Sequence, residues 1–349
     1  MKELVIGNNE AGKRFDKLLI KYLDKAPSSF IYKMLRKKNI TLNGKKAAGN
    51  EILSTGDIVK IFLADDTFDK FSSSTAVKPV VDPHNNLLKK HVDELDIIYE
   101  DDHFILMNKP YGMLSQKATP SDISINEVML GYLLKTGVVT EESLKTFKPS
   151  ICNRLDRNTS GLIIGGKSLL ALQTGAKILK NRSSDKYYLA FVAGKLQNSQ
   201  LIKGYLTKDV SSNTVSISQA GTDGDYIETK YEPIAIYENM TLLRVKLITG
   251  KPHQIRAHLA FINHPIIGDP KYGDLSINKL FFDKFGVRHQ LLHSFEFVFP
   301  DFDGALNHLS GRSFTAKPPK AFDIMIKGNT PVERKELADG YMELQGLKR

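Results

Sequence analysis

The chain has 349 residues, of which 41% are hydrophobic and 25% are charged, and this composition is typical of a globular protein. Its apolar runs fall short of the roughly 18 residues that cross a bilayer, so we expect no membrane-spanning segment. Cys152 is its single cysteine, which excludes an internal disulfide and a multi-cysteine zinc site and indicates a reducing compartment, the cytoplasm.

Positive charge is concentrated in the N-terminal part of the chain. The net charge is +10, and residues 1–63 carry 13 Lys and Arg against 6 Asp and Glu, whereas the rest carries 36 against 33. An excess confined to a small segment favours a polyanionic partner there over a charge that only serves solubility.

Residues 1–63 are predicted to form a compact helix–helix–strand domain. Apolar residues recur at helical spacing over 14–23, and a second helix begins after Ser28 or Ser29, either of which can cap it. Short strands are expected at 40–42 and 58–62, with a tight Asn43-Gly44 turn after the first. The second helix and its end carry a basic face, made of Lys33, Arg36, Lys37 and Lys38. This face is either a solvated helix surface or a contact to phosphates.

The rest of the chain is predicted to contain a linker, an α+β domain and a tail. Residues 64–92 lack apolar periodicity and are predicted to be a linker. Within 93–320, strands are expected at 96–99, 104–107, 162–164, 187–192, 231–237 and 242–248, and helices at 124–136, 168–181 and 254–261. Residues 321–349, rich in Lys and Glu, are expected to be a loosely attached tail.

The segment 153–162 places one carboxylate, Asp156, between Arg154 and Arg157. Turn-forming polar residues follow it, and then Gly161 and an apolar strand, so the carboxylate is expected to project from a loop at a strand edge. Adjacent cations favour its charged form, and an ionised carboxylate can act as nucleophile or general base. Taken alone, the alternative is an aspartate that caps a turn and makes local ion pairs.

Five further blocks accompany this segment in a fixed order. They are residues 101–113, 186–190, 249–259, 264–273 and 292–295. Together these blocks resemble the RluA family of pseudouridine synthases over roughly residues 95–300. The helix pair, basic face, Asn-Gly turn and closing strand of residues 12–63 resemble the S4 RNA-binding module, which makes the whole most similar to the RluC type.

The resemblance implies a pseudouridine synthase fold, with a large mixed, mainly antiparallel sheet, and an enzyme that isomerises uridines in RNA without a cofactor. Asp156 matches the family's catalytic aspartate, which attacks the target nucleoside so that the base detaches, rotates and rejoins through carbon. Tyr188 matches the tyrosine that packs on the base and is proposed to help remove the C5 proton, and Arg256 matches the basic partner of the aspartate. Arg154 matches an arginine that fills the space of the flipped nucleotide, and the basic face would follow an RNA backbone.

Some positions depart from the family pattern. Asn153 stands where the family usually has histidine, and Lys251 and Pro252 replace an arginine and a threonine. Asparagine cannot carry a positive charge, so an RNA contact at that point is expected to differ. The three residues assigned to catalysis match.

Several alternatives remain beside this interpretation. The substrate is expected to be 23S large-subunit ribosomal RNA, with transfer RNA as the alternative substrate and a non-catalytic RNA-binding ribosome-assembly factor as the alternative class. Residues 161–168 match a P-loop pattern, but their apolar centre predicts a strand. His253 and His258 would point about 140° apart on a helix, so no metal site is expected. Cys152 is expected to pack rather than react, and the chain to be a monomer.

Overall fold

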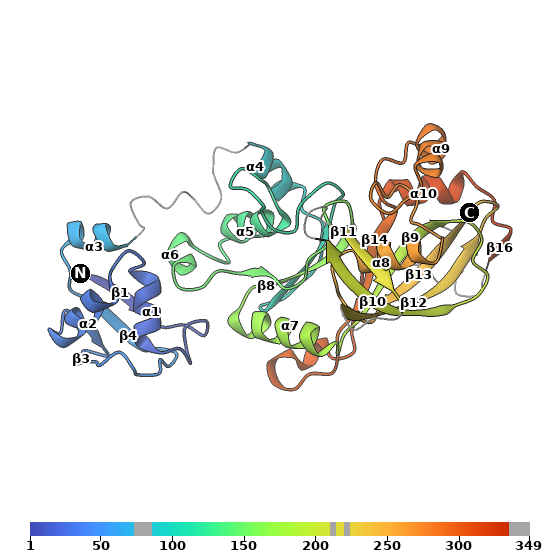
Figure 1. The fold of residues 1–349 in the computed structure, drawn as a ribbon. Coiled ribbons are helices and arrows are strands. Elements are labelled where there is room, and N and C mark those ends of the chain that lie inside the picture. The colour runs from blue at the N-terminus through green and yellow to red at the C-terminus, as the bar shows by residue number, and fades with distance from the viewer. Residues whose placement is uncertain (73–85, 210–213, 220–223, 335–349) are drawn as a thin grey trace.

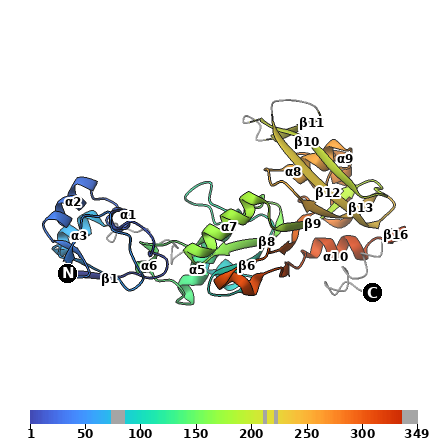
Figure 2. The ribbon, with the colours of Figure 1, turned by 90° about the horizontal axis from the view of Figure 1, so that it is seen from below.

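The computed structural model describes residues 1–72, 86–209, 214–219 and 224–334 of the 349. Within them the chain forms an N-terminal domain, residues 1–72, and a larger domain that begins at residue 86 (Figures 1 and 2). No helix in these ranges is long and apolar enough to cross a membrane.

The N-terminal domain packs helices against an antiparallel sheet with strand order β1-β4-β2-β3. Its elements are β1 (Lys2–Val5), α1 (Phe15–Tyr22), α2 (Ser28–Arg36), β2 (Ile40–Leu42), β3 (Lys45–Lys46), β4 (Ile58–Ile61) and α3 (Asp65–Phe71). The apolar stripes of α1 and α2 are buried in one core, as their spacing predicts. Asn43 and Gly44 both have positive φ, 52° and 73°, which suits the tight turn between β2 and β3.

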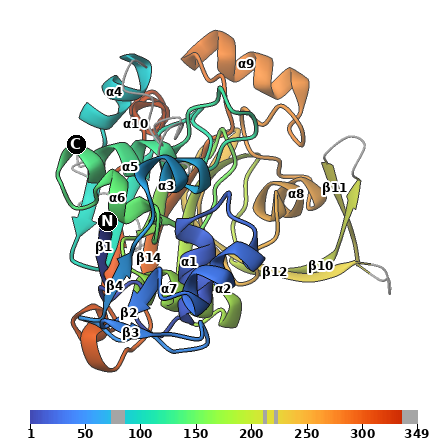
Figure 3. The same cartoon turned by 90° about the vertical axis from the view of Figure 1, so that its left-hand side faces the viewer.

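A single large sheet frames the second domain, and its main path runs β11-β10-β12-β13-β9-β14-β8-β6-β5. Its strands are β5 (Ile97–Glu100), β6 (Phe104–Lys109), β7 (Ser150–Ile151), β8 (Ser160–Gly166), β9 (Asp185–Ala193), β10 (Gln200–Asp209), β11 (Thr214–Ser218), β12 (Asp225–Ile236), β13 (Met240–Leu247), β14 (Leu292–Val298), β15 (Ser313–Thr315) and β16 (Glu333–Arg334). β14 and β8 pair in parallel, whereas the other pairs along this path are antiparallel. Strands β10 and β11 project from the rest as a hairpin (Figure 3).

Helices cover both faces of this sheet. They are α4 (Asn86–Asp93), α5 (Ile125–Lys135), α6 (Glu141–Leu144), α7 (Leu169–Asn181), α8 (Gln254–Phe261), α9 (Leu275–Phe285) and α10 (Lys320–Lys327). Alternate residues of β9 point to opposite faces. Tyr188, Ala190 and Val192 pack with α5 and α8, while Leu189 and Phe191 pack with α9 and α10. The side of the sheet that Tyr188 faces is therefore the side that carries α8.

Strand β8 begins where the chain must pass very close to β14. Gly161 has a φ of 111°, and a Cβ built on it would lie 2.2 Å from the carbonyl oxygen of Ser294. Only glycine fits both the conformation and the space. The segment 161–168 thus enters the sheet as a strand, as its apolar centre predicts, and does not form a phosphate-binding loop.

The two domains contact each other around α6 and the start of α7. Tyr22 donates a hydrogen bond to Glu142, and the ammonium of Lys21 donates to the Thr146 carbonyl over 2.9 Å. The Leu169 amide donates to the side chain of Asn9 over 2.9 Å. The contact is polar and involves residues of both α1 and the loop before it.

Two predicted boundaries differ from the structure. The segment 64–92, predicted to be a linker, contains α3 and α4, and its residues 73–85 lie outside the described part. Phe68 of α3 is buried in the N-terminal core, and Leu88 of α4 is buried in the second core. The segment 321–349, predicted to be a loose tail, contains β16 and most of α10. Phe322 and Met325 of α10 are fully buried. Residues 335–349 lie outside the described part. The apolar stripes of these helices are short and lie among charged residues, so the sequence pattern did not predict the helices.

Candidate active site

Asp156 lies in the loop that joins β7 to β8. The hydroxyl of Ser115 fixes this loop, because it donates to the Leu155 carbonyl over 2.7 Å and accepts from the Leu155 amide over 2.9 Å. The buried ammonium of Lys109 donates to the carbonyl of Arg157 over 3.0 Å. Both chain neighbours of Asp156 are thus held through their backbone, and the carboxylate projects from a fixed point.

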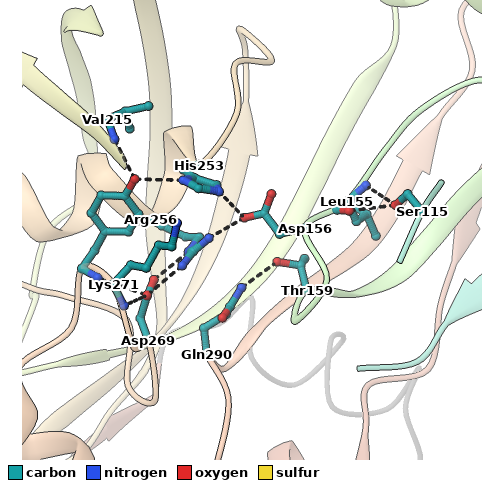
Figure 4. A network of polar contacts seen from close by, with 11 residues as sticks. Ser115, Leu155, Asp156, Thr159, Val215, His253, Arg256, Asp269, Lys271 and Gln290 are labelled. Carbon is teal, nitrogen blue, oxygen red and sulfur yellow. Dashed lines mark hydrogen bonds and ion pairs between the residues drawn. The ribbon is translucent and has the colours of Figure 1, made fainter. Parts of the chain in front are cut away.

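Arg256 reaches Asp156 from helix α8. Its Nη1 donates to Oδ2 of Asp156 over 2.7 Å, while Nε and Nη2 donate to the two oxygens of Asp269 over 2.7 and 2.9 Å (Figure 4). The amides of Lys271 and Tyr272 also donate to Asp269, over 2.9 and 3.1 Å. Oδ1 of Asp156 accepts no hydrogen bond from the described residues, and Figure 4 shows it turned away from Arg256.

Burial and ion pairing shift the pKa values of Arg256 and Asp269 in opposite directions. Burial alone would lower the pKa of Arg256, but the hydrogen bonds and charge of Asp269, and then of Asp156, raise it above its usual value. Burial alone would raise the pKa of Asp269, but the guanidinium lowers it. Both groups are therefore ionised at neutral pH, and the guanidinium is shared between two carboxylates.

These groups open into a cleft of about 810 Å³. Asp156, Tyr188 and Arg256 all line it, although they come from a loop, from β9 and from α8. Burial, the largest cause, raises the pKa of Tyr188 to about 12, so its phenol is protonated near neutral pH. The cleft thus combines a carboxylate oxygen without a partner among the described residues, a fixed guanidinium and a neutral aromatic ring.

Comparisons with known proteins show the family of the chain. Residues 103–261 match the family model of RNA pseudouridylate synthase. The protein named Ribosomal large subunit pseudouridine synthase C from Haemophilus influenzae is 32% identical over 305 residues, which cover 86% of this chain and 87% of that protein. Its namesake from Escherichia coli is 31% identical over 286 residues, or 80% and 82% of the two chains.

The chain belongs to the RNA pseudouridylate synthase family. Its predicted place among RluA-family, RluC-type enzymes is confirmed by these relatives. Two solved structures share the fold alone: Human RNA Pseudouridylate Synthase Domain Containing 1 has a TM-score of 0.55 at 20% identity, with 74% of this chain and 96% of that one covered. Human RNA Pseudouridylate Synthase Domain Containing 4 gives 0.56 at 20% identity, with 69% and 95% covered. The predicted α+β fold with its mixed, mainly antiparallel sheet is confirmed.

The predicted site residues of this pseudouridine synthase fall into two groups. Arg154 lines the same cleft as the three residues assigned to catalysis, and its side chain is exposed. The basic face of the N-terminal domain is also exposed but does not line the cleft; it consists of Lys33, Arg36, Lys37 and Lys38. A role for that face in RNA binding stays a prediction.

Two buried residues of the site carried no predicted chemical role. Asp269 stands in the block 264–273, but its 13-residue separation from Arg256 gives no local sign of their pairing. The ammonium of Lys109 donates to the carbonyls of Pro110, Met113 and Arg157 over 2.7 to 3.0 Å. Burial lowers the pKa of Lys109 to about 7. Asp269 thus fixes the position of Arg256, and Lys109 fixes the backbone beside Asp156.

Asn153 and His253 have partners that explain their residue types. The amide of Asn153 donates to the Leu162 carbonyl over 3.2 Å and accepts from the Ile164 amide over 2.8 Å, so it fastens the loop to β8. His253 pairs with the Tyr272 hydroxyl over 2.9 Å, and its Nε2 lies 3.8 Å from Asp156. Burial lowers the pKa of His253, which leaves it neutral near pH 7.

Proposed function

We propose that this pseudouridine synthase isomerises uridines of large-subunit ribosomal RNA, with Asp156 as the nucleophile. The proposal depends on one arrangement: Asp156, Arg256 and Tyr188 line a common cleft, and Oδ1 of Asp156 faces away from its ion-pair partner. The relatives named for ribosomal large-subunit modification support the choice of RNA.

In this proposal Arg256 orients the carboxylate through Oδ2 and leaves Oδ1 to attack the target nucleoside. The bond between N1 of the base and the sugar breaks as the bond to Asp156 forms. The base rotates, and its C5 bonds to the sugar as the bond to Asp156 breaks, so the carboxylate is restored. The proton lost from C5 to solvent is matched by one that N1 takes up. The base must leave its stack to reach Asp156, and the ring of Tyr188 offers a face that replaces the lost stacking. A phenol with a pKa of about 12 suits this packing role better than removal of the C5 proton. Arg154 would occupy the space that the flipped nucleotide leaves.

The N-terminal domain would add affinity through phosphate contacts. Its helix pair, Asn-Gly turn and exposed basic face support an S4-like role, in which Lys and Arg position the RNA and carry little sequence information. An enzyme that acts on ribosomal RNA would work in the cytoplasm, and we propose that it does so as a monomer without a metal or cofactor. Sedimentation of the purified chain would test the oligomeric state.

Mapping pseudouridine in total RNA from cells with and without the gene tests the substrate. The proposal expects sites in large-subunit ribosomal RNA to disappear with the gene and to return with the wild-type chain. Loss confined to transfer RNA would contradict the ribosomal substrate. If no pseudouridine site is lost, the result would favour a non-catalytic ribosome-assembly factor.

A further inference from the structure

A second hollow, of about 490 Å³, lies on the sheet face opposite the catalytic cleft. Tyr188 pairs in register with Val245 of β13, and both pack into the core on the cleft side. Their chain neighbours Tyr187 and Lys246 point the other way and line this hollow, together with Lys230 of β12. We call it the Arg182 hollow, after the residue that closes α7 at its rim.

Cations outnumber carboxylates around the Arg182 hollow. Four basic side chains line it, namely those of Arg182, Lys230, Arg244 and Lys246, against the acidic side chains of Asp185 and Glu232. Lys246 forms an ion pair with Asp185, and Lys230 forms one with Glu232, each over 2.8 Å. An ammonium has three donors, so both lysines can keep these pairs and still donate to an anion. Arg182 is exposed and has no side-chain partner in the described ranges.

The hollow also has features that suit a nucleotide rather than a bare ion. The guanidinium of Arg244 stacks on the ring of Tyr187 at 3.7 Å, and Glu296 holds it in place over 2.8 Å. Ser184 is only 5% exposed and lines the hollow, and its hydroxyl finds no hydrogen-bond partner among the described residues. A buried hydroxyl of this kind is costly unless a ligand or water satisfies it.

The Arg182 hollow adjoins the catalytic cleft. Arg182 and Leu247 line both, and Lys180 and Lys186 line the cleft beside them. Burial and then the charge of Arg182 lower the pKa of Lys186, as expected for cations crowded together. A polyanionic strand leaving the cleft at this edge would reduce that repulsion and pass directly into the hollow.

We propose that the Arg182 hollow binds a nucleotide of the substrate RNA that flanks the target uridine. Arg182 and Lys246 would hold its phosphate, Ser184 would donate to it, and the base would lie beside the stacked Tyr187 and Arg244. This inference rests on the proposed function, because the strand that enters the hollow is the one whose uridine lies over Asp156. A free phosphate-bearing molecule would share the same chemistry, so the test separates the two sources.

Binding of fluorescein-labelled oligouridylates of 3 to 12 nucleotides, followed by anisotropy at several salt concentrations, tests the inference. The variants are Arg182→Gln and Lys246→Gln, both at accessible positions. Each should bind the longest RNA about threefold to tenfold more weakly. The salt slope, which is the slope of log affinity against log salt concentration, should be shallower by about 0.7, the value of one phosphate contact to a single strand. Lys246 lines the hollow but not the cleft, so the loss in Lys246→Gln should appear only when the RNA is long enough to span both cavities.

Lys195→Gln is the matched control. Lys195 also forms a surface ion pair, with Glu238 over 3.0 Å, but lies beyond the opposite end of β9. It should bind every RNA as the wild type does. Equal binding of the longest RNA by wild type and variants would overturn the inference. So would a loss of inorganic phosphate binding in the variants without a loss of RNA binding, because the occupant would then be a free phosphate ligand.

Failure of the proposed function gives a different result. A wild-type chain that binds long RNA through the hollow but forms no pseudouridine contradicts the assigned reaction and leaves the hollow supported. A chain that forms pseudouridine while the variants bind all RNAs normally contradicts the hollow alone.

Discussion

At the scale of single residues, Asp269 decides how Arg256 meets Asp156. Asp269 is fully buried and accepts from Nε and Nη2 of the guanidinium, which orients Nη1 toward Asp156. If Asp156 loses its charge in a covalent bond to the substrate, Arg256 still has a counter-ion. No unpaired buried charge then arises during the reaction, which would otherwise cost several kcal/mol.

Replacing Asp269 with asparagine should therefore damage catalysis through a residue that does not touch the substrate. We expect Asp269→Asn to lower kcat by about 100-fold, because Arg256 is misplaced, and the free energy of unfolding by about 3–5 kcal/mol. Single-turnover pseudouridine formation and urea unfolding measure the two effects. Asp283→Asn, at an exposed ion pair with Lys279, is the control and should change neither. Wild-type turnover of Asp269→Asn would refute this role.

At the scale of elements, the strands beside the site are joined by a buried histidine. His293 of β14 bonds to the Ser160 hydroxyl of β8 over 2.9 Å and to the Ala316 carbonyl over 3.0 Å. Burial lowers the pKa of His293 to about 4. The folded state therefore contains a neutral imidazole at a pH where the unfolded chain, with an ordinary pKa near 6.5, is already protonated.

This difference predicts a loss of stability in acid. Between pH 6.5 and 4 the unfolded chain binds more protons at His293, so stability falls as the pH falls, by roughly 3 kcal/mol over the whole window. His293→Gln should be less stable than wild type at pH 7 but should lose less on going to pH 4.5. Urea unfolding at both values measures this. The exposed His289→Gln should lose as much as wild type, and an equal loss in all three chains would disprove the prediction.

Elements with a clear local pattern could be predicted from the sequence, and those that depend on distant partners could not. Helix α8 matches its predicted span, and β8 was recognised from its apolar centre. The short strands β1 and β16 consist mostly of exposed residues. They form because β1 pairs with β4 and β16 pairs with β12, which the sequence pattern does not show. The site follows the same rule: Asp156, Tyr188 and Arg256 could be assigned from family motifs, whereas the Asp269 pairing needs the folded chain.

At the scale of the whole molecule, the basic face and the cleft lie in different domains joined by polar contacts. Neutralising the whole face tests whether it binds RNA. The variant carries Lys33→Gln, Arg36→Gln, Lys37→Gln and Lys38→Gln. Its RNA affinity should fall, and its salt slope should become shallower by up to about 3, because each lost phosphate contact removes about 0.7. Filter binding at 50 to 200 mM salt measures both.

The matched control removes four positive charges from scattered surface pairs. It carries Lys90→Gln, Lys135→Gln, Lys195→Gln and Lys279→Gln. A net-charge effect would make both variants alike, and this result would mean that the basic face is only solvated. A specific contact makes the basic-face variant clearly weaker than the control.

Pseudouridine formation by Asp156→Asn, measured beside RNA binding, tests the central claim most directly. The asparagine keeps the size of the side chain and can still meet Arg256 through its oxygen, so the cleft and the RNA affinity should persist. Because an amide oxygen is a poor nucleophile, no pseudouridine should form even at long times with excess enzyme. Turnover within tenfold of wild type would contradict the assignment of Asp156 as the attacking group.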